Sequence, residues 1–434
     1  MSPNILYIIC HDLGQQLSCY GDQSVTSPNL DRLAEEGVRF ENYFCAATPC
    51  SPSRGCIMTG RYAHNNGLTG LVNAGWDMPE RETTIVDYLN EAGYNTYQIG
   101  FQHERRDPLK NRYKHSESDI AGCEVVADRV AEFLRAAAVK EQPFYLNTGF
   151  SEVHLPFDRK EYVPDNPDDV YVPSYLPDNK YVRQELANFH GSIKFMDEAV
   201  GKIVRALNES QLGKNTVVIF TTDHGMAFPR AKSTLYDSGI KTALIMKFPE
   251  GMVKPGVYRE LISNIGLAPT LLEMIGADIP ERIQGKSFYR LLTGEKYERR
   301  DRIYSEKNFH SIYDPIRCIR TEQYKYIRSF EPGNKRKLPL CGDITRSIAS
   351  RELIEGADEL RPSEELYDIK ADPDELNSFI DNPDYQKIRQ TLSEELLKWM
   401  EDTDDPILKG PLPRPAGCLW PENPVDPWPS FPQT

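Results

Sequence analysis

The feature that most constrains this chain is the regular alternation of short apolar runs with segments of helical periodicity. Alternation of this kind is typical of an α/β fold, in which helices cover both faces of a mostly parallel sheet. One predicted helix has Ser27 as its N-cap, Pro28 at its first position and Gly37 at its end. The predicted strands are Asn4–Cys10, Tyr94–Ile99, Phe144–Thr148, Thr216–Thr222 and Ala243–Phe248, and the other predicted helices are Thr83–Ala92, Cys123–Val139, Arg183–Leu207 and Leu267–Ile275.

The pattern changes near residue 300, where short β-rich runs replace the alternation. They predict a smaller antiparallel sheet, followed by a helix over Tyr385–Glu401. A length of 434 residues also favours two domains, so we expect a catalytic domain over 1–300 and a smaller α+β domain over 301–434. The tail after Asp404 is rich in Pro and Trp and is predicted to wrap the surface in extended form. The predicted short strands are Arg302–Glu306, Ile316–Arg320, Tyr324–Arg328 and Glu365–Ile369.

Composition narrows the class of protein. No apolar run reaches the roughly 18 residues that a membrane span needs. The first apolar run, Ile5–Cys10, is too short for a signal peptide, so we expect an intracellular, cytoplasmic protein. Nine cysteines without zinc-type or redox-type spacing predict free thiols. A net charge of −14 argues against nucleic-acid binding, and the oligomeric state stays open.

Reactive side chains follow four of the five predicted strands. Ligands bind outside the carboxyl ends of the strands in open α/β sheets, so we expect these residues to share one site. The alternative for each residue alone is a helix cap or a strand-exit turn. The residues concerned are His11 and Asp12, His103, His154, and Asp223 with His224.

Part of this set suits a divalent cation. Asp12, Asp223 and His224, together with His11, offer hard oxygen and imidazole nitrogen ligands. A cation bound there would polarise an anionic ester and lower the pKa of a nucleophile.

Residues 48–56 read Thr-Pro-Cys-Ser-Pro-Ser-Arg-Gly-Cys. Ser51 or Ser53 is a predicted N-cap, which would place Cys50 at a helix N-terminus, where free N–H groups stabilise an anion. Arg54 would add a fixed positive charge about one turn further on. The residues alone therefore predict an activated cysteine in an anion site. The alternative is a proline-rich loop with a buried thiol.

The same segment matches the Cys-x-Pro-x-Arg signature of type I sulfatases, from Cys50 to Arg54, and residues 58–62 resemble its continuation. The resemblance extends over nearly the whole chain and includes the runs at 27–34, 365–368 and 372–373. It implies an alkaline-phosphatase-like α/β fold with a smaller C-terminal antiparallel sheet and helix. It also implies sulfatase activity on a sulfated carbohydrate, with Cys50 oxidised to formylglycine by a maturation enzyme.

Three stretches are similar to the heparan N-sulfatases, also called N-sulfoglucosamine sulfohydrolases. They lie at 223–236, at 310–317 and at Asp405-Pro406. This similarity implies the N-sulfate or an O-sulfate of glucosamine in heparan-type glycans as the group removed.

The resemblance also implies a role for each candidate residue. Calcium is the expected metal, and the imidazoles of His11 and His224, which replace an Asp and an Asn of the family pattern, keep manganese and zinc open. The alternative for each residue is a structural or surface role; His64 is expected to support the loop, and His115 and His190 to be structural or solvated. The implied metal ligands are Asp12, Asp223, His224, His11 and the modified Cys50; Arg54 would hold the formylglycine, His103 and His154 would contact the sulfate or the leaving group, and Lys232 would neutralise a sulfate oxygen.

One departure from the family pattern is at position 101, where Phe101 stands in place of a lysine that binds sulfate in the family. Arg105 or Arg106 would have to supply that positive charge instead. The segment also carries Lys110, Arg112 and Lys114, so residues 105–114 would form either a basic rim for a polyanionic sugar or an ordinary solvated loop. Two other functions stay open: a phosphonate or phosphate ester hydrolase of the same superfamily, and a non-catalytic glycan-binding relative.

Overall fold

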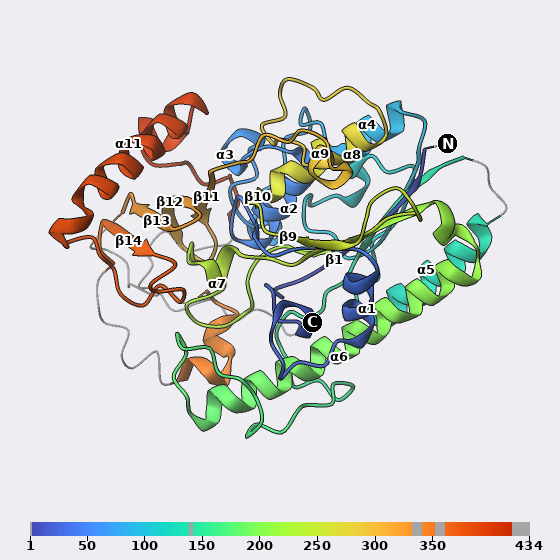
Figure 1. Cartoon of the computed structure of the whole chain (residues 1–434), viewed down its shortest axis with the longest axis horizontal. Helices are drawn as coiled ribbons and strands as arrows, with labels where there is room; N and C mark the ends of the chain where they lie inside the picture. Colours follow the sequence, from blue (N-terminus) through green and yellow to red (C-terminus); the bar gives the residue numbers. More distant parts are fainter. Residues whose placement is uncertain (1, 139–141, 332–340, 352–360, 419–434) are drawn as a thin grey trace.

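The computed structural model describes residues 2–138, 142–331, 341–351 and 361–418. Its centre is an eight-stranded sheet with the order β5-β4-β6-β1-β7-β8-β2-β9 (Figure 1). Only β8 runs antiparallel to its neighbours, so the expected mostly parallel sheet is confirmed. The strands are β1 (Asn4–Cys10), β2 (Val38–Phe40), β4 (Asn95–Gly100), β5 (His115–Glu117), β6 (Phe144–Gly149), β7 (Thr216–Thr222), β8 (Leu244–Lys247) and β9 (Gly256–Tyr258).

Helices cover both faces of this sheet. The strands β1 and β7 are buried along their whole length, as expected for parallel strands that are packed on both sides. On one face lie α1 (Pro28–Glu36), α5 (Cys123–Ala137) and the long α6 (Lys180–Glu209). On the other face lie α2 (Cys50–Thr59), α4 (Ile85–Glu91), α8 (Leu267–Met274) and α9 (Tyr289–Thr293). Shorter elements are α3 (Ala63–Asn66), α7 (Asp237–Ile240) and the two-stranded sheet of β3 (Tyr43–Phe44) and β10 (Ile262–Ser263).

The predicted C-terminal sheet is present as four antiparallel strands in sequence order. Its helix α11 (Gln386–Asp402) packs on it through a cluster that includes Trp399 and Tyr326 (Figure 1). A bridge between Ala47 and Glu306 links this sheet to the segment before α2. The strands are β11 (Arg302–Phe309), β12 (Tyr313–Thr321), β13 (Tyr324–Ser329) and β14 (Glu364–Asp368). The division of the chain at residue 300 remains a prediction.

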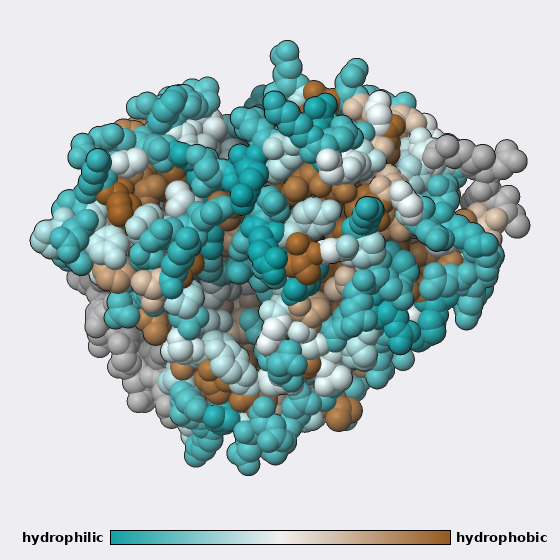
Figure 2. Space-filling view, in the orientation of Figure 1, coloured by the Kyte–Doolittle hydropathy of each residue, from teal (hydrophilic) through white to brown (hydrophobic). Residues whose placement is uncertain are grey.

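The prediction that the tail after Asp404 is extended is wrong for its first residues. Residues Pro406–Lys409 form a 3-10 helix, η9, because Asp405 caps it by accepting a hydrogen bond from the Ile407 backbone. Residues 419–434 lie outside the described part of the chain. Within the described part, no helix has the length and apolar character to cross a membrane. On the face shown in Figure 2, hydrophobic residues are scattered among hydrophilic ones.

Candidate active site

The carboxyl ends of four neighbouring parallel strands meet at one edge of the sheet. The strands β4, β6, β1 and β7 lie side by side in that order, and each is followed by a segment that carries a candidate residue. The loops after them hold His103, His154, His11 with Asp12, and Asp223 with His224. The sheet therefore gathers side chains from segments that are far apart in the sequence.

Five of these side chains form one buried group, which we call the strand-end cluster: His11, Asp12, Cys50, Asp223 and His224. One potential ligand atom of each lies within 4.8 Å of the others. The Nε2 atom of His224 is 3.1 Å from Asp12 Oδ1 and 3.0 Å from Cys50 Sγ. The Nδ1 atom of His11 is 2.7 Å from Asp12 Oδ1.

Local backbone geometry holds the two acidic turns together. Asp12 has a left-handed backbone with φ of 53°, and its N–H donates to Asp223 Oδ1 at 3.0 Å. A Cβ on Gly225 would lie 1.9 Å from the carbonyl oxygen of Ser238. Only glycine fits such a close approach, which explains the residue after the Asp-His pair.

Cys50 is the first residue of α2, so the prediction that Ser51 or Ser53 caps this helix is wrong. The N-cap is Pro49, and both serines hold other elements in place. The Ser51 hydroxyl accepts from the Val72 backbone, and the Ser53 hydroxyl donates to the carbonyl of Asp223. Cys50 still lies in the first turn of the helix, and the second hydrogen bond fixes that turn against the end of β7.

Arg54 lies one turn further along α2 and is fully buried. Its Nε donates to Asp223 Oδ2 at 3.0 Å, and its Nη2 donates to the carbonyl of Cys10 at 3.0 Å. Its Nη1 has no hydrogen-bond partner among the described residues. The guanidinium lies over the ring of Phe101 at 5.2 Å. A buried donor without a partner is costly, so Nη1 is suited to an incoming oxygen atom.

Lys232 reaches the opposite side of the cluster. Its Nζ donates to Asp12 Oδ2 at 2.5 Å, and it is 3.2 Å from His154 Nε2. A further acceptor, Asp343, is missing from the sequence-based site. The segment that holds Asp343 lies between β13 and β14 of the C-terminal sheet, and nothing in its sequence resembles a site motif.

His103 and His154 flank the cluster. The ring of His154 lies 4.8 Å from that of His11, and the ring of His103 lies 6.1 Å from it. The Nδ1 atom of His103 is buried without a partner among the described residues. His310 also belongs near this edge, because it groups with Cys341 and Asp343. His310 stands in one of the sequence stretches noted above, but that stretch gave no role for it.

One of the two proposed replacements for the missing lysine, Arg105, is not free to bind an anion. Arg105 is buried and donates to backbone carbonyls, including that of Met78 at 2.6 Å. Other members of the basic segment are paired as well: Lys110 with Glu80, and Arg112 with Asp87. Arg106 is exposed. The basic rim is therefore largely a set of local ion pairs and carbonyl contacts.

The remaining histidines lie as predicted. His64 is buried and pairs with Glu306 at 2.9 Å, which supports the loop after α2. His190 is buried beside Asp165 at 3.0 Å. His115 is exposed and stacks on Tyr97.

The electrostatics of the cluster depend on burial and on its two cations. Although burial opposes ionisation, Lys232 and His11 hold the pKa of Asp12 well below its usual value. Burial lowers the pKa of His11 to about 4, which keeps its imidazole neutral. Burial raises the pKa of the Cys50 thiol well above its usual value, and Lys232 only partly opposes this. A protonated thiol is a poor nucleophile, so the activated thiolate is disfavoured.

The donor set of the strand-end cluster fits a divalent cation. It combines two carboxylates, two imidazoles and a sulfur position in one buried space. The Nδ1 atom of His224 is 2.9 Å from the carbonyl of Gly225. A hydrogen bond there places the ring proton on Nδ1 and leaves the Nε2 lone pair directed into the cluster, as in many metal sites.

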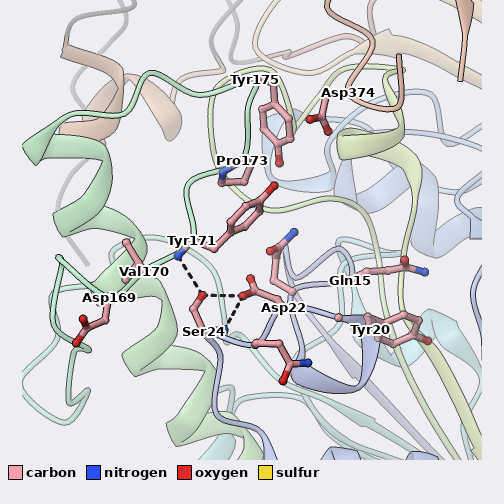
Figure 3. Close-up of a pocket in the computed structure, with 13 residues that line it drawn as sticks. Gln15, Tyr20, Asp22, Ser24, Asp169, Val170, Tyr171, Pro173, Tyr175 and Asp374 are labelled. Carbon is pink, nitrogen blue, oxygen red and sulfur yellow. Dashed lines mark hydrogen bonds between the residues drawn. The ribbon is translucent and has the colours of Figure 1, made fainter. Parts of the chain in front are cut away.

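A separate cavity of about 700 Å³ lies beside the loop that follows Asp12. Figure 3 shows tyrosine rings and carboxylates along its walls. No Lys or Arg is among the described residues that line it, so it is poorly suited to a sulfate group. It is lined by Gln15, Gln16, Tyr20, Gly21, Asp22, Gln23, Ser24, Asp169, Val170, Tyr171, Pro173, Tyr175 and Asp374.

Comparison with known proteins identifies the class. The sulfatase family model matches residues 3–277, and the model for the C-terminal part of N-sulphoglucosamine sulphohydrolase matches residues 224–339. Together with the α/β fold and its buried cluster, these matches define a sulfate ester hydrolase. The chain belongs to the sulfatase family.

The sequence identity to individual relatives is low. An ulvan-active sulfatase of Formosa agariphila is 28% identical, over 93% of this chain and 75% of that protein. Human N-sulphoglucosamine sulphohydrolase is 24% identical, over 94% of this chain and 92% of that protein. A solved structure in complex with its substrate, D-glucosamine-2-N,6-O-disulfate, has a TM-score of 0.74 at 20% identity and covers 93% of this chain and 99% of that one. At that identity, the last likeness shows the fold alone.

Proposed function

We propose that this chain is a formylglycine-dependent sulfatase that removes the N-sulfate or an O-sulfate of glucosamine in a heparan-type glycan. The observation that carries the proposal is the position of Cys50. It opens the Cys-x-Pro-x-Arg sequence, and its sulfur lies among the carboxylates of Asp12 and Asp223. The similarity to human N-sulphoglucosamine sulphohydrolase over nearly the whole chain supports the choice of sugar.

Asp12, Asp223, His11 and His224 are the proposed metal ligands, with the modified residue 50 beside them. We propose calcium, with manganese and zinc as alternatives because imidazoles make up half of the side-chain ligands. The cation would supply positive charge that polarises a sulfate oxygen and lowers the pKa of a hydroxyl nucleophile.

The chain's own residues would perform the remaining tasks. Oxidation of Cys50 by a maturation enzyme would place an aldehyde at the start of α2, and its hydrate would supply the attacking oxygen. Arg54 would hold that group through Nη1, the donor without a partner in the described part of the chain. Lys232 would donate to a sulfate oxygen and neutralise charge that develops there.

A leaving sugar oxygen or amine needs a proton. His103 and His154 are the candidates, because they approach the cluster from neighbouring strands. Nearby charges and burial give the two imidazoles different pKa values. Burial and His11 lower the pKa of His103 well below its usual value. Burial and Lys232 also oppose the charge on His154, but Asp12 and Asp343 outweigh them and raise its pKa. His154 is therefore the better proton donor near neutral pH.

The test is a side-by-side assay of sulfate, sulfamate and phosphonate esters, with N-sulfated and 6-O-sulfated glucosamine among the substrates. The protein is produced with a maturation enzyme, and intact mass under dehydrating conditions reports conversion of the Cys50 thiol to an aldehyde. We expect conversion, and turnover of the sulfated sugars. A preference for phosphonate esters would support the alternative hydrolase. An unmodified Cys50 in the native host would support the glycan-binding alternative.

A further inference from the structure

The ammonium group of Lys232 is surrounded by acceptors. It has three N–H donors, and three polar groups among the described residues lie around it: Asp12 Oδ2 at 2.5 Å, the imidazole Nε2 of His154 at 3.2 Å, which accepts when the ring is neutral, and Asp343 Oδ2. The Lys232 side chain is fully buried. An oxygen atom of an incoming anion can therefore bind Lys232 only in two ways. Either one of these groups moves away from Nζ, or the anion and that group accept from the same N–H of Lys232.

Asp343 is the charged acceptor that faces outward. Its side chain is 21% exposed, whereas that of Asp12 is fully buried within the strand-end cluster. His154 is also partly exposed, but its imidazole carries no negative charge in either protonation state. Asp343 thus places a negative charge at the open side of a site that receives anions.

The Asp343 carboxylate is held in this position by its own segment. Its Oδ1 accepts from the Ile344 backbone at 3.1 Å and caps the 3-10 helix η6 (Ile344–Arg346). The neighbouring Gly342 N–H donates to the Ser311 hydroxyl at 2.8 Å, which ties the segment to the end of β11. These contacts hold the negative charge beside Lys232 in the structure.

A fixed negative charge repels a doubly charged anion more strongly than a singly charged one. Coulomb repulsion is proportional to the charge of the second ion. A sulfate ester carries one negative charge, whereas inorganic sulfate carries two, and a phosphate monoester carries nearly two at neutral pH. Asp343 therefore repels the two dianions about twice as strongly as a sulfate ester at the same position.

We propose that Asp343 selects singly charged tetrahedral groups over doubly charged ones at Lys232. This selection favours sulfate esters over phosphate monoesters and helps to expel the sulfate dianion after hydrolysis. The inference rests on the proposed function, which places the sulfate group of the substrate at Lys232.

The experiment compares two small anions of similar shape and different charge. Inorganic sulfate carries two charges and the sulfamate ion carries one. Dissociation constants for both are measured by thermal shift, at fixed calcium concentration and ionic strength, on the chain with its Cys50 thiol. The proteins are the wild type, Asp343→Asn, and Asp381→Asn as a control. The asparagine at 343 keeps an oxygen that can cap η6, and Asp381 is an exposed carboxylate in the same C-terminal region.

In Asp343→Asn we expect the affinity for sulfate to rise about tenfold more than the affinity for sulfamate, because only the charge of residue 343 has changed. Asp381→Asn should leave the ratio of the two affinities at its wild-type value. An unchanged ratio in Asp343→Asn, or weaker sulfate binding, would overturn the inference and would show that Asp343 only positions Lys232. Failure of both anions to bind any of the three proteins would instead count against the anion site itself, and so against the proposed function.

Discussion

Two buried groups of charges in this molecule differ in what they leave unsatisfied. The sheet-interface network consists of Asp237, Arg320, Lys325 and Glu375, and it joins the central fold to the C-terminal sheet. Its two cations balance its two carboxylates: Lys325 lies 2.6 Å from Asp237 and 2.8 Å from Glu375, and Arg320 lies 3.0 Å from Asp237. Such a network joins α7 of the central fold to β12 and β13 of the C-terminal sheet through paired charges.

The strand-end cluster is not balanced in this way. Its carboxylates and imidazoles converge on one space from separate strands, and Arg54 keeps a buried N–H donor without a partner among the described residues. Burial of charge alone therefore does not mark function. The strand-end cluster differs in that side chains suited to bind a metal converge on one space from separate strands, beside a buried donor without a described partner.

The largest difference between the two groups should come from Cys50. Cys50→Ala removes the residue that becomes the nucleophile, so kcat/KM for sulfated glucosamine should fall by at least about 10⁴-fold, with little change in stability. Cys56→Ala is the matched control, because Cys56 is a buried cysteine of the same helix that packs in the core under the C-terminal sheet. It should change stability and leave turnover intact. Equal losses of turnover in both variants would contradict the assignment of Cys50.

A substitution in the sheet-interface network should lower stability and leave turnover unchanged. Lys325→Met removes the cation that lies 2.6 Å from the buried Asp237 carboxylate, and breaking a buried ion pair costs about 3–5 kcal/mol. Urea denaturation should show this loss, while kcat/KM of the folded enzyme should stay unchanged. Lys370→Met, at an exposed position, is the control for loss of charge alone. A loss of activity without a loss of stability would show that the network takes part in the site.

Calcium affinity should also distinguish the strand-end cluster from other buried carboxylates, with a smaller effect than the loss of turnover in Cys50→Ala. Asp12→Asn should lower calcium affinity by at least about 100-fold, since even changes to the partners of metal ligands typically cost 10–100-fold. Asp197→Asn is the control, because Asp197 is also a buried carboxylate but accepts hydrogen bonds from the start of α1. It should reduce stability without changing calcium titrations. Unchanged calcium affinity in Asp12→Asn would remove Asp12 from the proposed ligand set.

The two groups also differ in how far the sequence predicts them. Asp12, Asp223 and His224 could be predicted because each follows a strongly apolar strand, and parallel strands bring their carboxyl ends to one edge. No comparable pattern in the sequence marks Asp343 or Glu375. Asp343 reaches Lys232 only through the packing of the C-terminal segment on the central fold. Glu375 reaches Lys325 through the folding of the C-terminal segment itself, and neither residue lies in a periodic pattern. The same limit applies to Arg105, whose carbonyl partners depend on a loop that the sequence did not define.

The smallest expected effect is a change in pH dependence within the sheet-interface network. Burial raises the pKa of Glu375 to about 7, although Lys325 opposes this. The folded protein therefore holds a proton on this carboxyl more tightly than the unfolded chain does, and its contribution to stability is lost as the pH rises from about 4.5 to about 7. Glu375→Gln cannot ionise, so the free energy of unfolding should decline less steeply across that window, by about 3 kcal/mol in total. Urea denaturation of both proteins at several pH values gives the difference, and effects of other groups cancel in it. Parallel curves would mean that Glu375 is ionised in the folded state throughout, as a carboxylate fully neutralised by Lys325 would be.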